Sequence, residues 1–292
     1  MSDKPVIAIT GANGFIGSYL VGMLREKGYR VIAFSREPQV EADPGVAHRR
    51  FDLAAQDEPI NLAGCDVLVH CAYAKVKNAA EADAVNLAGT RRLYEAAKKA
   101  GMKRFLFLSS LSAHEGAISQ YGRIKLAIEK MLDVEKDLIL RPGLTLGHGG
   151  VFGNILRAVQ RSWVIPLVDG GRQRMQGIDI EDLGACLLAA LERDITGSYT
   201  LIADEDFTLR EMAQAIREKS GRRVPFVTVP YGLVNLGLAL VEFLRLPTPV
   251  RRENLLGLKQ NIRWETGDCE RVFGVAPMPF TRSVERLSKE KI

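Results

Sequence analysis

Tyr121 and Lys125 lie four residues apart in the stretch SQYGRIKLAIEK, residues 119–130, and such a pair could move protons. The stretch has the pattern of a helix, on which residues four apart share a face. A lysine ammonium stabilises a phenolate, so we expect the pKa of Tyr121 to lie below its ordinary value of about 10. Lys125 could also donate a hydrogen bond to the ribose of a nucleotide.

Two other tyrosine–lysine pairs have the same spacing, but their surroundings make them weaker candidates. Tyr94 and Lys98 belong to a helical stretch whose lysines are typical of a solvent-facing end, so we place this pair on the helix surface. Tyr73 and Lys77 follow a predicted strand directly, on a loop that gives the two side chains no common face. Tyr73 could still contact a substrate, but the pair is a poor catalytic couple.

A hydroxyl group precedes the Tyr121 pair at the end of a predicted strand. Ser109 and Ser110 end this strand, and Ser110 lies eleven residues before Tyr121. Because ligands of open parallel sheets sit at the carboxyl edge, Ser110 could hydrogen-bond a substrate carbonyl or alcohol there. A phenol, an ammonium and a hydroxyl together could couple proton transfer to hydride transfer.

The stretch TGANGFIG follows the first predicted strand and opens the first predicted helix. Its first glycine permits a tight turn, its second a close approach of the backbone to a pyrophosphate, and its third close packing of helix on strand. Free backbone amides at a helix start bind phosphate groups. The dinucleotide site is therefore predicted at Gly11, Asn13, Gly14, Phe15, Ile16 and Gly17.

The second predicted strand ends in Ser35 and Arg36, where an acidic residue would accept hydrogen bonds from an adenosine ribose. A guanidinium instead suits a 2′-phosphate, which it can bind in bidentate fashion. These residues favour NADP over NAD, with a solvated surface arginine as the alternative for Arg36. After the third predicted strand, Asp52 and Leu53 would lie near the adenine, and for Asp52 a turn cap is the alternative.

Short apolar runs rich in Val, Ile, Leu and Phe alternate with amphipathic stretches in the first half of the chain. This alternation predicts an α/β fold with a Rossmann-type, doubly wound parallel sheet. The predicted strands are residues 6–10, 30–35, 46–53, 66–72, 104–110 and 137–142, and the predicted helices are residues 15–27, 79–100 and 119–136.

The pattern changes in the second half of the chain. Residues 143–154 are rich in glycine and are predicted to form a loop, and residues 176–192 are predicted to form a strand and a helix. The dinucleotide-binding domain is predicted to comprise residues 1–142 and 176–203, and a small mixed α/β substrate lobe residues 143–175 and 204–292.

The composition is that of an ordinary globular protein, with 292 residues and a formal net charge of +5. Basic pairs without interleaved aromatic residues give no support for nucleic-acid binding. The first ten residues lack the pattern of a signal peptide, so we expect a cytoplasmic protein. The spacing of cysteines and histidines predicts no metal site, and we expect free thiols at Cys65, Cys71, Cys186 and Cys269.

Residues 224–247 are largely uncharged until Glu242. Its two early prolines and internal glycines argue against a transmembrane segment. We expect a short strand followed by an apolar helix over residues 231–245. This helix could pack in the core or in a dimer, or it could contact a partner or a membrane surface.

The chain resembles the short-chain dehydrogenase/reductase superfamily in its extended or atypical type, the NAD-dependent epimerase/dehydratase family. The resemblance rests on TGANGFIG, HCAY, NLAGT, FLSSLS, YGRIK, LRPG and IDIEDL, in this order. It implies Tyr121 as the acid/base, Lys125 as its assistant and Ser110 as the group that holds the carbonyl, with Ser112 as the alternative. Ala72 and Lys125 would line the nicotinamide side, and a homodimer is plausible by resemblance.

The chain departs from the sugar-nucleotide enzymes of this superfamily after the sixth predicted strand. Leu144 stands where they usually carry an asparagine that holds the diphosphate, and Arg174 falls about one residue from their phosphate-binding arginine. His148 lies on a predicted loop near the expected cleft, and we interpret it as a loop residue. The candidate substrate contacts are Tyr73, Ser112, His114 and Arg174.

Three functions are open at this point. An NADP-dependent oxidoreductase would act on a small-molecule carbonyl or secondary alcohol, with Tyr121 moving the proton. A nucleotide-sugar epimerase or dehydratase would use the same oxidation and return the hydride within one cycle. A non-catalytic NADPH-binding regulatory or assembly subunit finds its main support in the apolar helix over residues 231–245. The departures above weaken the nucleotide-sugar function and fit both a reductase and an accessory subunit, and the retained tyrosine favours an active enzyme.

Overall fold

The computed structural model describes residues 4–38, 45–76, 79–221, 223–235 and 262–290. The chain divides into two compact units. The first unit comprises residues 1–141 and 184–199, and the second comprises residues 142–183 and 200–292. That the two units bind dinucleotide and substrate, respectively, stays a prediction.

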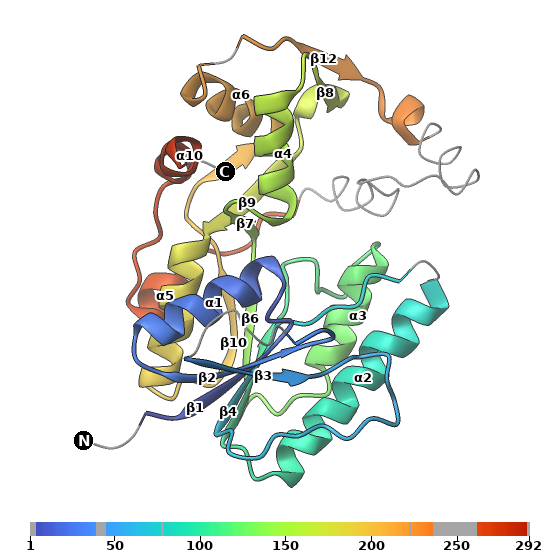
Figure 1. Ribbon diagram of the computed structural model, residues 1–292. Coiled ribbons are helices and arrows are strands. Elements are labelled where there is room, and N and C mark those ends of the chain that lie inside the picture. The colour runs from blue at the N-terminus through green and yellow to red at the C-terminus, as the bar shows by residue number, and fades with distance from the viewer. Residues whose placement is uncertain (1–3, 39–44, 77–78, 222, 236–261, 291–292) are drawn as a thin grey trace. The chain divides into compact units, whose positions relative to one another are not determined.

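The first unit contains a seven-stranded sheet in the order β10-β6-β5-β4-β1-β2-β3 (Figure 1). The pairs from β3 to β6 are all parallel, so the predicted doubly wound Rossmann-type sheet is confirmed. Its strands are β1 (Val6–Thr10), β2 (Arg30–Ser35), β3 (Val46–Arg50), β4 (Val67–His70), β5 (Arg104–Leu108), β6 (Leu138–Pro142) and β10 (Gly197–Leu201).

Helices cover both faces of this sheet (Figure 1). On one face, Leu93 and Tyr94 of α2 and Ile124 and Ile128 of α3 are buried in one core cluster with strand residues. On the other face, Gly184 of α5 lies against α1. The bounds are α1 (Phe15–Glu26), α2 (Ala79–Lys99), α3 (Gln120–Glu129) and α5 (Ile180–Glu192).

The predicted helix over residues 119–136 is too long. Ser119 is the N-cap, and α3 ends at Glu129. The backbone then turns at Asp133, whose carboxylate accepts a hydrogen bond from the N–H of Glu135 at 3.2 Å. An aspartate side chain that accepts a hydrogen bond from the backbone two residues later favours a turn over a helix. The turn at Asp133 therefore explains why α3 is shorter than predicted. The strands predicted over residues 46–53, 66–72 and 104–110 are likewise shorter in the structure.

The second unit is built from short strands and from helices that share one apolar core. A three-stranded sheet has the order β11-β9-β7, and β8 pairs in parallel with β12. The strands are β7 (Leu144–Leu146), β8 (Ile165–Val168), β9 (Arg174–Asp179), β11 (Asp206–Thr208) and β12 (Phe226–Val229). The helices are α4 (Gly150–Arg161), η1 (Asp169–Gly171), α6 (Leu209–Lys219), α9 (Asp268–Phe273) and α10 (Phe280–Lys289).

The glycine-rich residues 143–154 do not form the predicted loop. They contain β7 and the start of α4. A Cβ atom at Gly143 would collide with the carbonyl of Gln176, and one at Gly153 would collide with the carbonyl of His148. These glycines therefore allow regular elements to pack closely. The prediction that they mark an irregular loop is wrong.

The predicted apolar helix over residues 231–245 lies only partly within the described residues. Residues 231–235 are helical and follow β12, and residues 236–245 lie outside the described part of the chain. None of the helices in the described ranges has the length and apolar character needed to span a membrane.

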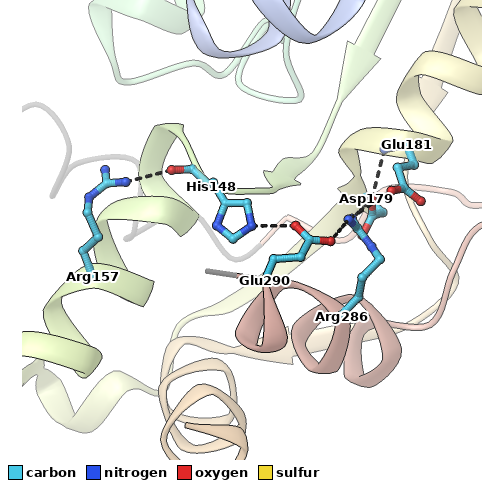
Figure 2. A network of polar contacts seen from close by, with 6 residues as sticks. All are labelled: His148, Arg157, Asp179, Glu181, Arg286 and Glu290. Atoms are coloured by element: carbon cyan, nitrogen blue, oxygen red, sulfur yellow. Dashed lines mark hydrogen bonds and ion pairs between the residues drawn. The ribbon is translucent and has the colours of Figure 1, made fainter. Parts of the chain in front are cut away.

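A charged network in the second unit joins α10 to β9, to the start of α5 and to the loop between β7 and α4 (Figure 2). Arg286 of α10 donates to Asp179 at 2.7 Å and pairs with Glu181 at 3.0 Å and with Glu290 at 2.9 Å. Glu290 also contacts Nε2 of His148 at 2.7 Å, on the loop between β7 and α4. We call these residues, together with Arg157, the α10 network; Arg157 donates to the carbonyl of His148.

Candidate functional site

The turn between β1 and α1 has the geometry expected of a phosphate-binding loop. Gly11 has a φ of +69°, a left-handed conformation that favours glycine. A Cβ atom at Gly17 would collide with the carbonyl of Gly11, so the helix packs directly on the turn. Gly14 is the N-cap of α1 and supplies no side-chain cap. The first backbone N–H groups of α1 therefore lack partners within the helix, and they can donate hydrogen bonds to an anion.

The same turn lies against the end of β4. A Cβ atom at Gly11 would lie 2.8 Å from the N and Cα atoms of Ala72. Asn13 follows this turn and donates to the carbonyl of Glu37 at 3.3 Å, beyond the end of β2. The residues predicted to bind the pyrophosphate and the nicotinamide thus lie on neighbouring strand ends, while their role as cofactor contacts stays a prediction.

The end of β2 presents the residues predicted to select the cofactor. Ser35 is buried and donates to the carbonyl of Glu37 at 2.8 Å, whereas Arg36 is exposed. Arg50 donates to the carbonyl of Arg36 at 2.5 Å and pairs with Glu58 at 3.1 Å. Arg50 was not assigned to the site from the sequence. It lies at the end of β3 and pairs in register with Ser35, so it brings a second guanidinium to the end of β2.

Asp52 and Leu53 have mainly structural contacts. The Asp52 carboxylate accepts from the N–H of Ala54 at 3.0 Å, which is the turn cap named as the alternative. The carbonyl of Leu53 would lie 2.5 Å from a Cβ atom at Gly89, so the loop after β3 packs closely on α2. Their position beside an adenine stays a prediction.

The start of α3 is fixed by two contacts. The Ser119 hydroxyl accepts a hydrogen bond from the N–H of Gly122 at 3.1 Å and caps the helix. A Cβ atom at Gly122 would collide with the carbonyl of Ser112. The helix therefore begins directly against the loop that follows β5, and this arrangement places Tyr121 beside Ser110.

Tyr121 is half-buried and hydrogen-bonded to Ser110, while the catalytic roles of the two residues stay a prediction. Burial raises the pKa of Tyr121 to about 12, against the lowering by Ser110. The expectation of a pKa below 10 is therefore wrong for this structure. The physical reason is burial of the phenol, and the Lys125 ammonium does not offset it, because its Nζ atom donates to the carbonyl of Leu108 at 2.6 Å and lies 5.8 Å from the centre of the Tyr121 ring.

Lys125 is a buried amine in a mixed apolar and polar setting. Burial lowers its pKa to about 8, while Cys71 and Glu129 act to raise it. Its Nζ atom lies 4.5 Å from the centre of the Phe107 ring. Burial also raises the pKa of the Cys71 thiol to about 12, so this thiol is neutral near pH 7.

Tyr73 joins the same cluster. Its ring meets the Tyr121 ring edge-on, with centroids 4.9 Å apart at 76°, and Lys125 Nζ lies 5.8 Å from its centre. Lys77, its partner by spacing, lies outside the described residues. The structure therefore brings Tyr73 to the catalytic candidates, although its contact with a substrate stays a prediction.

The predicted position of Tyr94 on a helix surface is wrong. It is 7% exposed, and its hydroxyl donates to the Asp137 carboxylate at 2.6 Å. Lys98 Nζ lies 4.6 Å from the centre of its ring. The apolar face of α2 carries Tyr94 into the core, where the long-range contact with Asp137 satisfies the hydroxyl.

The remaining predicted site residues have different surroundings. The Ser112 N–H donates to the Ser110 hydroxyl at 3.2 Å, so Ser112 supports Ser110 through its backbone. His114 is half-buried in the same loop. Arg174 belongs to the second unit, on β9, and pairs with Asp206 of β11 at 2.9 Å.

His70 is a residue of this region that the sequence analysis did not assign. Its imidazole is fully buried, with Nδ1 2.6 Å from the Thr10 hydroxyl and Nε2 3.0 Å from the Thr90 hydroxyl. Burial lowers its pKa to about 3, and the Lys125 charge acts in the same direction. The motifs HCAY and NLAGT contain two of these residues, but the sequence alone does not show that they meet.

Glu129 was also missed, and it lies one helical turn after Lys125. Its side chain is 4% exposed and pairs with Arg141 of β6, whose Nε lies 3.0 Å from Oε1. The Ser109 hydroxyl donates to the same carboxylate. Ser109, Lys125, Glu129 and Arg141 are called the α3 network below.

The fold and this cluster together define a class: a Rossmann-fold, nucleotide-binding enzyme with a serine just after β5 and a tyrosine and a lysine on α3. The family model named NAD dependent epimerase/dehydratase family matches residues 7–201. The chain therefore belongs to this family of NAD(P)-dependent enzymes, and the resemblance noted in the sequence is confirmed.

Several characterised proteins are similar along most of the chain. A ceramide reductase of Caulobacter vibrioides is 31% identical over 256 residues, covering 82% of this chain and 78% of that protein. A UDP-glucose 4-epimerase of Vibrio cholerae is 26% identical, covering 73% and 74%. The crystal structure of a UDP-glucose 4-epimerase of Thermotoga maritima with UDP-glucose has a TM-score of 0.78 at 19% identity and covers 97% of both chains, a likeness of fold alone.

Proposed function

We propose that this protein is an NADP-dependent oxidoreductase that transfers a hydride between the nicotinamide and a carbonyl or secondary alcohol. The observation that carries the proposal is the contact between Tyr121 and Ser110, with the Lys125 amine beneath both Tyr121 and Tyr73. This arrangement holds a proton donor and a carbonyl-binding hydroxyl in one place.

The residues present fit the cofactor. The uncapped amides of α1 and the glycine turn at Gly11 suit a pyrophosphate, and Ala72 lies beside that turn. NADPH, when bound, supplies the hydride. In place of an acidic residue, the exposed Arg36 and the neighbouring Arg50 offer guanidinium groups at the end of β2, which favours a 2′-phosphate.

The roles of the side chains follow from their protonation. Because the pKa of Tyr121 is about 12, its hydroxyl keeps its proton near pH 7 and can donate it to the carbonyl oxygen as the alcohol forms. Ser110 would donate a hydrogen bond to the same oxygen and hold it. The Lys125 ammonium would stabilise the phenolate that remains and donate to a ribose hydroxyl.

The substrate class is proposed from the relatives. The ceramide reductase and a 3-beta-hydroxysteroid dehydrogenase of Mycolicibacterium neoaurum, 23% identical over 291 residues, are both named for lipids. We therefore propose a carbonyl on an apolar molecule. The aromatic ring of Tyr73 beside Tyr121 supports this proposal, because it presents apolar surface at the candidate site.

A nucleotide-sugar epimerase is the second candidate, and the Vibrio cholerae relative favours it. Leu144 argues against it, because the apolar side chain cannot donate to a diphosphate as the expected asparagine would. A non-catalytic NADPH-binding subunit has less support, because the tyrosine, the lysine and the serine are all present.

The test is turnover by the purified protein. We expect oxidation of NADPH in the presence of lipid ketones, a preference for NADPH over NADH that Arg36→Ala reduces, and no interconversion of UDP-glucose and UDP-galactose. Tight NADPH binding without turnover over a broad carbonyl panel would instead support the non-catalytic subunit. Epimerisation of the UDP-sugars would support the second candidate.

A further inference from the structure

Two residues of α3 hold Leu108, the last residue of β5, and Ser109, which follows it. Lys125 Nζ donates to the carbonyl oxygen of Leu108 at 2.6 Å, and the hydroxyl of the next residue, Ser109, donates to the carboxylate of Glu129. Lys125 and Glu129 are separated by about one helical turn. The helix is thereby fastened at two points to the strand end that directly precedes Ser110.

Glu129 brings a charge into this junction. Its side chain is 4% exposed, so the carboxylate has lost nearly all contact with water. Arg141 Nε contacts both of its oxygens, at 3.0 and 3.1 Å, and Ser109 adds a further donor. A buried carboxylate is tolerated only with such partners, and these hydrogen bonds fix its position relative to Lys125.

The other titratable groups around Lys125 are neutral near pH 7. Burial keeps the pKa of His70 at about 3 and that of Cys71 at about 12, and Tyr121 also has a pKa of about 12. The titratable groups that face Lys125 among the described residues are His70, Cys71, Tyr73, Tyr121 and Glu129. Glu129 is therefore the carboxylate available to oppose the cost of burying the ammonium.

We propose that Glu129 is a positioning residue for the reaction, whose charge keeps the Lys125 amine protonated and whose bond to Ser109 keeps the end of β5 in place against α3. Its role in turnover rests on the proposed function. Its effect on the protonation of Lys125 does not, because that effect needs neither cofactor nor substrate.

A matched pair of variants separates the two effects. Glu129→Gln removes the charge but keeps an oxygen that accepts from Ser109, whereas Ser109→Ala removes that hydrogen bond and keeps the charge. The probe is ¹⁵N NMR of the lysine side chains in the full chain, with the Lys125 signal assigned from Lys125→Arg. We expect Glu129→Gln to lower the titration midpoint of Lys125 by roughly one pH unit. Ser109→Ala should leave the midpoint unchanged.

The activity arm uses the same proteins. In wild type, kcat/KM for reduction should fall as pH rises through the Lys125 midpoint, and in Glu129→Gln this fall should begin at lower pH. Glu129→Asp should restore the wild-type profile, because it keeps the charge. A merely structural Glu129 would lower kcat/KM equally at all pH values.

An unchanged Lys125 midpoint in Glu129→Gln overturns the proposal. If that variant does not fold, Glu129→Gln is made on the Arg141→Gln background and compared with Arg141→Gln alone, and an equal Lys125 midpoint in these two proteins overturns the proposal. A shifted NMR midpoint in a protein that turns over no substrate would support the proposal about Lys125 while refuting the oxidoreductase function.

Discussion

The α3 network and the α10 network each place an arginine between carboxylates or beside one, but they differ in how completely their polar atoms are paired. In the α3 network, every buried polar side-chain atom described has a partner. In the α10 network, Oδ2 of Asp179, Nε of Arg286 and Nδ1 of His148 are buried with no hydrogen-bond partner among the described residues (Figure 2).

This difference in pairing indicates how strongly each network fixes the positions of its side chains. A fully paired network gains from the low dielectric around it and is held in one arrangement, which suits side chains that must keep a catalytic geometry. In a partly paired network, each unpaired polar atom carries a desolvation cost unless water binds it. The arrangement of its side chains is therefore less strongly determined. We therefore expect the α3 network to control chemistry and stability strongly, and the α10 network to have smaller effects.

The largest expected effect is on turnover. Tyr121→Phe removes the proton donor next to the α3 network and should lower kcat by about 10²- to 10⁴-fold, while the affinity for NADPH changes little. Glu290→Gln in the α10 network should leave kcat largely unchanged. Steady-state kinetics and fluorescence titration of NADPH measure both quantities, and retained turnover in Tyr121→Phe would remove Tyr121 from its assigned role.

The next effect is on stability. Arg141→Ala leaves the buried Glu129 carboxylate without its cation and should lower the free energy of unfolding by about 3–5 kcal/mol. Arg286→Ala should cost less, because one Asp179 oxygen is already unpaired and the other keeps the N–H of Glu181 at 2.9 Å. Denaturant unfolding of both variants at pH 7 makes the comparison, and a larger loss in Arg286→Ala would reverse our ranking of the networks.

The pH dependence of stability tests the contribution of Lys125, the buried amine of the α3 network. Because burial lowers its pKa from 10.5 to about 8, the unfolded chain binds more protons between these values, and stability should rise with pH in that window. Relative to Lys125→Met, the wild type should gain about 3 kcal/mol between pH 8 and pH 10.5. The measurement is the difference between the two unfolding free energies at each pH, and a constant difference would contradict the assigned pKa.

The smallest effect is expected at His148. Burial acts to raise the pKa of Glu290, but the hydrogen bond from His148 and the charge of Arg286 outweigh it and lower the pKa below 4.5. A lowered carboxylate pKa stabilises the fold above pH 4.5, and this contribution is lost as pH falls through the folded value. His148→Ala should therefore cost at most about 1 kcal/mol at pH 6, because Glu290 is 44% exposed. Thermal unfolding at pH 6 and at pH 3 should show the difference vanish in acid.

The sequence predicted the sheet well and the interior charges poorly. The strands over residues 6–10 and 30–35 match the structure, because short apolar runs bounded by turn residues determine them locally. The placement of Tyr121 beside Ser110 also followed, since a strand end and a helix start in this fold meet at one edge. The pairing of Glu129 with Arg141 could not be predicted, because it depends on how α3 and β6 pack.

The lowered pKa of Lys125 and the raised pKa of Tyr121 have the same origin. Helical spacing identified the two groups as neighbours, but the sign of each shift depends on burial, which one sequence does not give. The shortened α3 illustrates a local signal that we overlooked, since the aspartates of MLDVEKD favour a turn.

The string of hydrogen bonds from Thr10 through His70 to Thr90 has a consequence for how this protein can be handled. One ring nitrogen donates to a hydroxyl and the other accepts from one, so its lone pair is not open to a transition metal, and burial keeps the pKa of His70 at about 3, so the ring gains no proton in mild acid. The junction of β1, β4 and α2 should therefore be indifferent to nickel or zinc contamination and to mild acid. Crystallisation and assay conditions can then be varied widely without disturbing the glycine turn next to Thr10.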